Sequence, residues 1–277
     1  MNELYIVIEI ATGDAEQQDL LIAQLNDCLE IDGFEQLDSS IKMFLKEQNF
    51  KEDQFKNIIQ INDVKYKQST INNENWNAKW ESSFDPVLIN KFVAVRADFH
   101  SKIEDVEYEI IITPKMSFGT GHHATTTMML ESLRQYNPSG KSVIDFGTGT
   151  GVLAILAEKM GAKDILAIDY DDWSITNTAE NIVQNNCLNI SLQQADHFPA
   201  SGKWDIILAN INLNVIIENM PALANGLKKD GILIISGILK ENTQEILKAA
   251  TDNGFETETI NEKNNWLCLA FKKMHTD

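Results

Sequence analysis

The sequence predicts an α/β protein with a largely parallel sheet, preceded by a smaller α+β domain. From about residue 90, short apolar runs alternate with segments of helical periodicity, as expected of a parallel sheet covered by helices on both faces. Before residue 72 the predicted elements follow a different order, and a polar segment separates the two parts. We therefore expect a domain over residues 1–71, a linker over 72–90 and a second domain over 91–277.

The first part is predicted to run strand, helix, strand, strand, helix, strand. The expected strands are 4–10, 34–38, 41–45 and 64–71, and the expected helices are 15–30 and 51–60. This order is typical of a ferredoxin-like module. The following segment is rich in Asn and Ser and contains a proline, as a linker would. Trp76 and Trp80 lie one helical turn apart in it, and we favour a packing role over a binding role for both.

The second part is predicted to alternate strands and helices to the end of the chain. Strands are expected over 92–98 and 108–113, then in KSVIDFG, DILAIDY, NISLQQAD, WDIILAN and GILIISG, and in a final pair; helices are expected over 122–136, 151–160, 172–186, 212–228 and 240–252. Ligands of such sheets bind outside the carboxyl ends of the strands. The residues that end strands are therefore the candidate binding residues.

Charge and composition restrict the partners. The chain has 277 residues, with 23 Lys and Arg against 41 Asp and Glu, a net charge of −18. This charge disfavours direct binding of nucleic acid or an anionic membrane and favours a basic partner, although it also suits solubility alone. No apolar run approaches the roughly 20 residues of a membrane span, no signal peptide is evident, and the three cysteines are far apart. We expect a cytoplasmic protein.

A glycine turn follows the strand that ends at Asp145. In VIDFGTGTGVLAI, Gly147, Gly149 and Gly151 stand at alternate positions before a helix. Glycine allows positive φ and lets a ligand approach the backbone. A dinucleotide-binding turn would need glycine where Val152 stands, and no GK[ST] of a P-loop follows. The alternative is a purely structural turn.

Three further strands are predicted to end in polar residues, at Asp169, Asp196 and Asn210. An acid that ends the second strand is well placed to accept both hydroxyls of a ribose. Each of these residues could instead cap the helix that follows it. Taken together with Asp145, they predict one nucleoside-like ligand across the sheet edge.

DFGTGTG, AIDYD and the following ANIN resemble the motifs of class I S-adenosylmethionine-dependent methyltransferases. The resemblance implies a seven-stranded sheet with an antiparallel last strand over about residues 90–277, and S-adenosyl-L-methionine as cofactor. It implies that Gly147 and its neighbours, Gly149 among them, approach the methionine part, that Asp169 holds the ribose, and that Asp196 lies near the adenine. This fold serves many methyl acceptors, so these motifs do not identify the substrate.

A second motif, PKMSFGTGHHATTT, precedes this core at residues 114–127. Its helix-start threonines suit an anion or plain N-capping. His122 and His123 lack a third ligand at metal-site spacing, so no metal is expected and a loop-capping or substrate-facing role is favoured. FGTGHHATT, with WNAKW, LANIN and ILIISGIL, resembles the PrmA family of bacterial ribosomal protein methyltransferases, which modify large-subunit ribosomal protein eleven. By that resemblance Thr126 and Asn210 also contact the cofactor, and the N-terminal module recognises the substrate.

The resemblance implies transfer of methyl groups to lysine side-chain and N-terminal amines of a basic ribosomal protein. The sequence identifies no catalytic residue with certainty, nor which amines are methylated. One alternative is methylation of another protein, a small-molecule amine or an adenine amino group, but LANIN lacks the aromatic of an NPPY motif that would stack on a base. The other is a non-catalytic cofactor-binding regulator.

Overall fold

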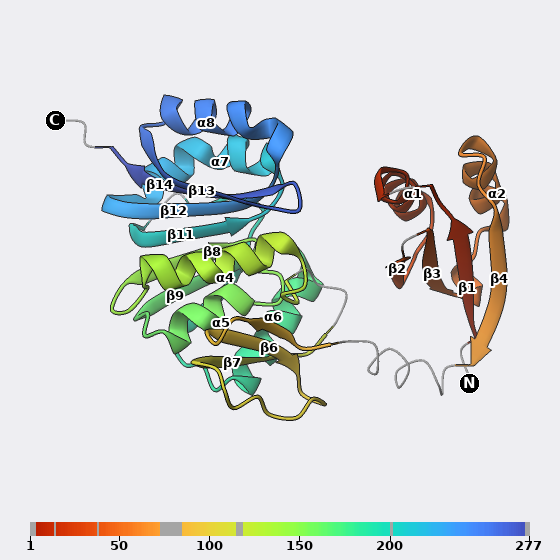
Figure 1. The fold of residues 1–277 in the computed structure, drawn as a ribbon, viewed down its shortest axis with the longest axis horizontal. Coiled ribbons are helices and arrows are strands. Elements are labelled where there is room, and N and C mark those ends of the chain that lie inside the picture. Colours follow the sequence, from red (N-terminus) through yellow and green to blue (C-terminus); the bar gives the residue numbers. More distant parts are fainter. Residues whose placement is uncertain are drawn as a thin grey trace. The chain divides into compact units, whose positions relative to one another are not determined.

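The computed structural model describes residues 4–13, 15–37, 39–72, 85–114, 119–199 and 202–274. The chain divides into two compact units, Met1–Phe84 and Asp85–Asp277, each of which is drawn in Figure 1. The expectations for residues 73–84, including Trp76 and Trp80, lie outside the described residues. Strand β5 (Val87–Ile89) occupies the last part of the segment expected to be a linker and belongs to the second unit.

In its described residues, the N-terminal unit is an antiparallel sheet with two α-helices and a short 3-10 helix. Its elements are β1 (Leu4–Ala11), α1 (Ala15–Cys28), β2 (Gly33–Leu37), β3 (Ser40–Lys46), the short helix η1 (Glu47–Asn49), α2 (Glu52–Ile61) and β4 (Tyr66–Asn72). The sheet order is β2-β3-β1-β4, so the predicted ferredoxin-like arrangement is confirmed. Alternate residues of a strand point to one face, and Ile8 and Met43 accordingly pack with Leu25 and Phe55 in one apolar core.

The second unit is built on a seven-stranded sheet. Its strands are β8 (Ser142–Phe146), β9 (Asp164–Asp169), β10 (Ile190–Gln194), β11 (Trp204–Asn210), β12 (Leu227–Leu239), β13 (Phe255–Lys263) and β14 (Trp266–Lys273). The order is β10-β9-β8-β11-β12-β14-β13, and β14 runs in the direction opposite to the other six strands. The predicted sheet with an antiparallel last strand is confirmed.

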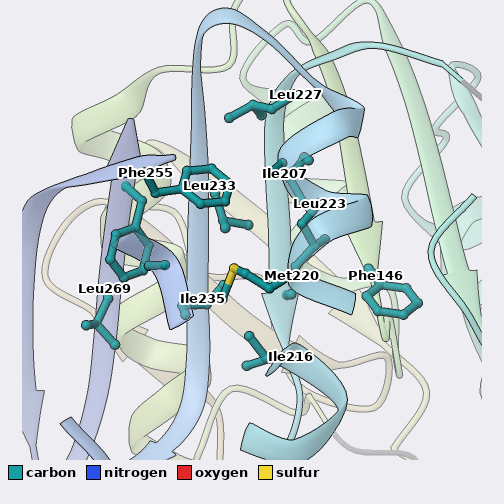
Figure 2. Close-up of a cluster of buried hydrophobic side chains, with 14 of the residues drawn as sticks. Phe146, Ile207, Ile216, Met220, Leu223, Leu227, Leu233, Ile235, Phe255 and Leu269 are labelled. Carbon is teal, nitrogen blue, oxygen red and sulfur yellow. The ribbon is translucent and has the colours of Figure 1, made fainter. Parts of the chain in front are cut away.

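The described part of this unit also contains five α-helices and a short 3-10 helix: α4 (Ala124–Tyr136), α5 (Val152–Lys159), α6 (Asp172–Gln184), α7 (Leu213–Gly226), η3 (Lys240–Asn242) and α8 (Thr243–Asp252). The helix expected over 240–252 thus begins with a 3-10 turn. Figure 2 shows the core under α7, where Met220 and Leu223 pack on Ile207 and Leu233. Truncating such a buried side chain to Ala typically costs about 2–5 kcal/mol.

The two faces of the sheet differ in what they bury. Ile207 and Ala209 of β11 face the apolar core under α7, so the alternation of a strand places Asn210 on the opposite face. Phe146 of β8 belongs to the same core, so the same alternation places its neighbour Asp145 on the other face of the sheet. On this second face α4 packs: the Cys268 thiol of β14 lies 3.4 Å from the Ser132 hydroxyl of α4. Asp145 and Asn210 therefore share the face that carries α4.

The strands expected over 92–98 and 108–113 do not join the main sheet. They are β6 (Val93–Ala97) and β7 (Tyr108–Ile112), and they form a separate sheet of order β5-β6-β7. β6 and β7 are parallel, whereas β5 and β6 are antiparallel. At the other edge of β7, the side chain of Asn185, the residue that follows α6, both donates to and accepts from the backbone of Ile111. A strand whose edge is satisfied in this way needs no neighbour from the main sheet.

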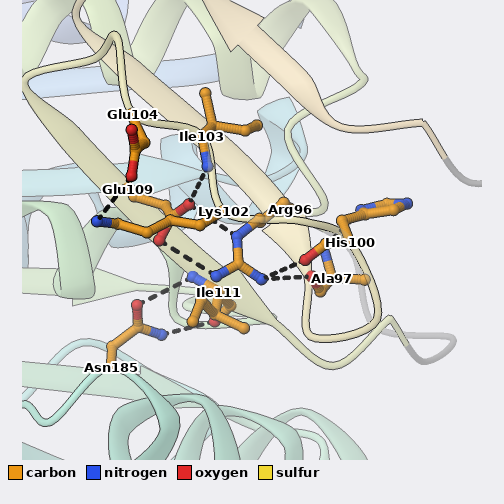
Figure 3. A network of polar contacts seen from close by, with 9 residues as sticks. All are labelled: Arg96, Ala97, His100, Lys102, Ile103, Glu104, Glu109, Ile111 and Asn185. Carbon is orange, nitrogen blue, oxygen red and sulfur yellow. Dashed lines mark hydrogen bonds and ion pairs between the residues drawn. The ribbon is translucent and has the colours of Figure 1, made fainter.

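A buried ion pair fixes the turn after β6, as Figure 3 shows. Arg96 donates to both carboxylate oxygens of Glu109, at 2.8 and 3.2 Å, and to the carbonyls of Ala97 and His100. Partial burial acts to raise the pKa of Glu109, but hydrogen bonds from Arg96 and from the Ile103 amide outweigh it, so this pKa lies below its ordinary value. The small sheet therefore holds β7 in a defined position against α6.

Candidate functional site

Polar residues lie at the carboxyl ends of three neighbouring strands, as the sequence predicted. Asp145 is the second-to-last residue of β8, and Asp169 and Asn210 end β9 and β11. Because these strands are parallel neighbours in the order β9-β8-β11, the three residues lie along one edge of the sheet. This edge is the usual position of ligands in open α/β sheets.

Asp196 does not end a strand, which corrects the sequence expectation. β10 ends at Gln194, because its ladder with β9 stops at the pair of Gln194 and Asp169. The side chain of Asp196 is 83% exposed, and its Oδ1 lies 2.5 Å from Nδ1 of His197. The hydrogen bond with His197 lowers the pKa of Asp196. The structure therefore leaves Asp196 at the rim, apart from the buried strand ends.

The glycine turn, residues 147–151, is attached to the end of β9. The amides of Gly147 and Thr148 both donate to the carbonyl of Ile168 at 2.8 Å. Gly147, Gly149 and Gly151 have φ of 80°, 57° and 80°, in the left-handed region where glycine is favoured. A Cβ on Gly147 would lie 2.2 Å from Cγ2 of Ile211. The turn is therefore closely packed as well as conformationally restricted to glycine.

Asp169 joins this turn to the strand end. Its Oδ2 accepts from the Gly149 amide at 2.9 Å and its Oδ1 accepts from the Asp171 amide at 3.1 Å. The residue is 8% exposed. A carboxylate oxygen has two lone pairs, so each oxygen of Asp169 retains one acceptor position. The carboxylate can therefore accept two ligand hydroxyls while it holds the turn.

Asp145 lies beneath the turn and is fully buried. Burial raises the pKa of Asp145 from its ordinary 3.8 to about 7, although the Thr148 hydroxyl and the Ala154 amide favour the charged form; the charge of Asp169 raises it further. The Thr148 hydroxyl donates to its Oδ2 at 2.7 Å. Asp145 therefore anchors the turn from below.

The loop of residues 119–123 and the start of α4 face the end of β11. His123 caps α4: its Nδ1 accepts from the Thr125 amide at 3.3 Å and lies 2.7 Å from the Thr125 hydroxyl. In the first turn of α4, the Thr126 hydroxyl accepts from Nδ2 of Asn210 at 3.3 Å. The other amide atom of Asn210, Oδ1, is buried and accepts no hydrogen bond from the described residues. A ligand with an N–H donor would satisfy it.

The side chains of the paired histidines make hydrogen bonds in the loop and at the start of α4. Nδ1 of His122 lies 3.1 Å from the Thr120 hydroxyl and its Nε2 lies 2.9 Å from the Asp85 carbonyl, while His123 caps α4. Within the part of the chain that the structure describes, no group of three His, Cys, Asp or Glu side chains could hold a metal ion. The favoured loop-capping role agrees with the position of His123.

Two sets of polar residues in the site were missed by the sequence reasoning. The Thr150 hydroxyl donates to the Gly119 carbonyl at 2.7 Å and thereby joins the two motifs. On α6, Thr178 donates to the Gly149 carbonyl and Asn181 to the Thr150 carbonyl. A signal was present in the sequence: Asn177, Asn181 and Asn185 recur every four residues of the expected helix, so they share one face. Their burial could not be inferred without the sheet and loops against which α6 packs.

Comparisons with known proteins identify the family that this chain resembles. The family model described as Ribosomal protein L11 methyltransferase (PrmA) matches residues 7–274. The ribosomal protein L11 methyltransferase of Porphyromonas gingivalis is 40% identical over 200 residues, which are 71% of this chain and 69% of that protein. The protein of the same name from Phocaeicola vulgatus is 34% identical over 248 residues, 87% of this chain and 88% of that protein.

One similar crystal structure has enough identity to inform more than the fold. The ribosomal protein L11 methylase of Lactobacillus delbrueckii subsp. bulgaricus is 30% identical, with a TM-score of 0.65. The match covers 69% of this chain and 100% of that chain. No helix within the described ranges is long and apolar enough to cross a membrane.

Proposed function

Because the chain belongs to the ribosomal protein L11 methyltransferase (PrmA) family, we propose that it methylates lysine side-chain and N-terminal amines of ribosomal protein L11. It is an S-adenosylmethionine-dependent methyltransferase. The observation that supports the chemistry is the position of two strand-end residues. The Asp169 carboxylate accepts a hydrogen bond from the Gly149 amide, and the Asn210 side-chain amide donates one to the Thr126 hydroxyl. A cytoplasmic location is part of the proposal, since the substrate is a ribosomal protein.

The residues at the sheet edge fit this cofactor. Asp169 keeps one acceptor position on each oxygen, which matches the two hydroxyls of a ribose. Gly147 and Gly149 present backbone without Cβ atoms, which suits close approach of the methionine part. Thr126 lies in the first turn of α4, where helix-start amides favour a carboxylate. Asp196 is the proposed neighbour of the adenine, from its exposed position beyond β10.

The acceptor amine must lose a proton before it can react. When bound, S-adenosylmethionine supplies a methyl group on a sulfonium sulfur: a nitrogen–carbon bond forms as the carbon–sulfur bond breaks, and the sulfur leaves as a thioether. A lysine with its reference pKa near 10.4 is neutral in only about one molecule in a few thousand at pH 7, whereas an α-amine near 8 needs less help. The proton passes to water, and desolvation in the site lowers the amine pKa.

Asn210 is the residue that we propose to orient the amine. Its Oδ1 is buried and has no hydrogen-bond partner among the described residues, and it can accept an amine N–H so that the nitrogen lone pair faces the methyl carbon. Thr126 fixes the other end of the same amide through its hydroxyl. Orientation of this kind is a large part of the rate enhancement when the methyl donor is already activated.

The N-terminal unit is the proposed binding module for ribosomal protein L11. The net charge of the whole chain, −18, complements a lysine-rich partner. If charge attraction contributes, the KM for ribosomal protein L11 should rise steeply with salt. The dissociation constant of S-adenosylhomocysteine, measured in the same buffers, should change far less.

The test is incubation of the purified protein with S-adenosylmethionine and unmethylated ribosomal protein L11, followed by intact-mass spectrometry. We expect mass steps of one methylene each, located by peptide mapping on lysine side chains and the N-terminal amine. A mixture of the other large-subunit proteins is the control for substrate choice. Steps on another protein would overturn the substrate, and S-adenosylhomocysteine binding without methyl transfer to any protein would favour a regulator.

A further inference from the structure

Asn181 of α6 contacts the glycine turn and Thr113, the residue that directly precedes the second motif. It is fully buried. Its Oδ1 accepts from the Thr113 amide at 2.7 Å, and its Nδ2 donates to the Thr150 carbonyl at 2.8 Å. Thr113 leads from β7 into the second motif, and Thr150 belongs to the glycine turn. One side-chain amide therefore joins the two segments.

The connection continues through Thr150 to the loop of residues 119–123. The Thr150 hydroxyl, which is fully buried, donates to the Gly119 carbonyl at 2.7 Å. Gly119 has φ of 106°, and a Cβ there would lie 2.9 Å from the Thr150 hydroxyl oxygen. The loop is thus held closely against residue 150. Since this loop runs directly into α4, the position of Thr126 depends on it.

We propose that Asn181 is a positioning residue for methyl transfer. Through Thr150 it fixes the loop of residues 119–123, and with it the Thr126 hydroxyl that orients Asn210, relative to the glycine turn. This inference rests on the proposed function of the site. A positioning role differs from a general role in stability, because two other hydrogen bonds hold the glycine turn. The Gly149 amide donates to Asp169, and the Thr178 hydroxyl donates to the Gly149 carbonyl. Cofactor binding should therefore survive the loss of Asn181 better than turnover does.

Asn185, one helical turn further along α6, is a matched control. Its side chain makes two hydrogen bonds with the backbone of Ile111, at 2.6 and 3.0 Å, and one with the Asn181 carbonyl. It is 7% exposed, and no hydrogen bond joins its side chain to the glycine turn or to residues 119–123. Asn185→Leu and Asn181→Leu remove comparable buried polar groups, but only Asn181→Leu breaks the connection to Thr150.

The experiment measures hydrogen exchange and kinetics on the full chain. Without substrate, amide exchange over residues 119–125 should become faster in Asn181→Leu than in Asn185→Leu or the unmodified protein. The dissociation constant of S-adenosylhomocysteine should change less than about threefold. In methyl transfer, kcat should fall about tenfold or more in Asn181→Leu, since small misplacements of reacting groups have effects of this size, and stay within about threefold in Asn185→Leu.

The inference is overturned if Asn181→Leu retains normal exchange and kcat, or if Asn185→Leu reproduces its effects. Should Asn181→Leu fail to fold, Thr150→Val decides the matter: it removes only the hydroxyl on the Gly119 carbonyl and should show the same pattern of faster exchange and lower kcat. Unchanged exchange and kcat in Thr150→Val would overturn the inference. Exchange and S-adenosylhomocysteine binding need no ribosomal protein, so a wrong substrate assignment would be recognised separately.

Discussion

The carboxylate of Asp169 accepts a hydrogen bond from the amide of Gly149 at 2.9 Å. The residue proposed to hold the cofactor ribose therefore also shapes the turn proposed to receive the methionine part. Its second oxygen accepts from the Asp171 amide, so both oxygens are oriented before any ligand binds. Such preorganisation reduces the loss of conformational freedom on binding.

Replacement of Asp169 by Ala should weaken cofactor binding strongly. The variant loses two acceptors for ribose hydroxyls and the anchor of Gly149. A hydrogen bond to a charged group is worth about 1.5–3 kcal/mol. Loss of one such bond should raise the dissociation constant of S-adenosylhomocysteine by about tenfold to a hundredfold, and loss of both should raise it further, as measured by calorimetry. Asp196→Ala is the matched control: its exposed carboxylate should contribute less than about fivefold. Equal effects of the two substitutions would contradict the assignment of the ribose to Asp169.

Asn210 and Thr126 should act as one unit in turnover. Asn210→Ala removes the proposed amine acceptor, and Thr126→Val removes the hydroxyl that fixes the Asn210 amide at 3.3 Å. We expect kcat to fall about a hundredfold in Asn210→Ala and less in Thr126→Val. In the double variant Thr126→Val should add almost nothing, because its effect passes through Asn210. Full additivity of the two effects on kcat would show that they act independently.

Asp145 should make the stability of the second unit depend on pH. Its pKa of about 7 in the folded chain lies above the ordinary 3.8 because of burial, so between these values the folded state binds a proton that the unfolded state lacks. The resulting stability is complete below about pH 4 and is lost as pH rises through 7. Asp145→Asn lacks this dependence and keeps an acceptor for Thr148.

The prediction for Asp145→Asn is a difference between the free energies of unfolding of two proteins. The contributions of the other titrating groups cancel in this difference. The free energy of unfolding of Asp145→Asn minus that of the unmodified protein should increase on the order of 3 kcal/mol from pH 5 to pH 8. Denaturant unfolding at several pH values measures it. A difference that is constant with pH would mean that Asp145 is charged in the folded protein throughout.

Gly237 should tolerate substitution less well than another glycine of similar φ. At Gly237, φ is 88° and a Cβ would lie 2.2 Å from the Ile211 carbonyl oxygen. At Gly254, φ is 79° and, apart from the two chain neighbours, no atom of the described residues would lie within 4 Å of a Cβ. Gly254→Ala should therefore lose only the roughly 1–2 kcal/mol of a left-handed residue. Gly237→Ala should lose about 3 kcal/mol or more, because the backbone of Ile211 must move. It should also lower kcat, since Ile211 follows Asn210; equal losses of stability would refute the steric argument.

The strand ends were predictable because they depend on local patterns. Apolar runs ending in Asp145, Asp169 and Asn210 identify strands, and parallel strands bring their carboxyl ends to one edge. The glycine turn was predictable for the same reason, because glycine readily adopts a positive φ. Gly147, Gly149 and Gly151 all have a positive φ in the structure. Asp196 was misplaced because the end of an edge strand depends on where its partner β9 stops, and the sequence of β10 carries no sign of this.

The sequence by itself determined the two-part α/β architecture, the glycine turn and the acid at the end of β9, because periodicity and backbone preference act over a few residues. Only the tertiary structure decided that β6 and β7 form their own sheet, that Thr150 holds Gly119, and that Asn181 lies between two motifs. The hydrogen bonds with which Thr150 and Asn181 connect the two motifs join residues 31 or more positions apart. Whether a polar side chain is buried, and which backbone group it then satisfies, depends on the elements that pack against it.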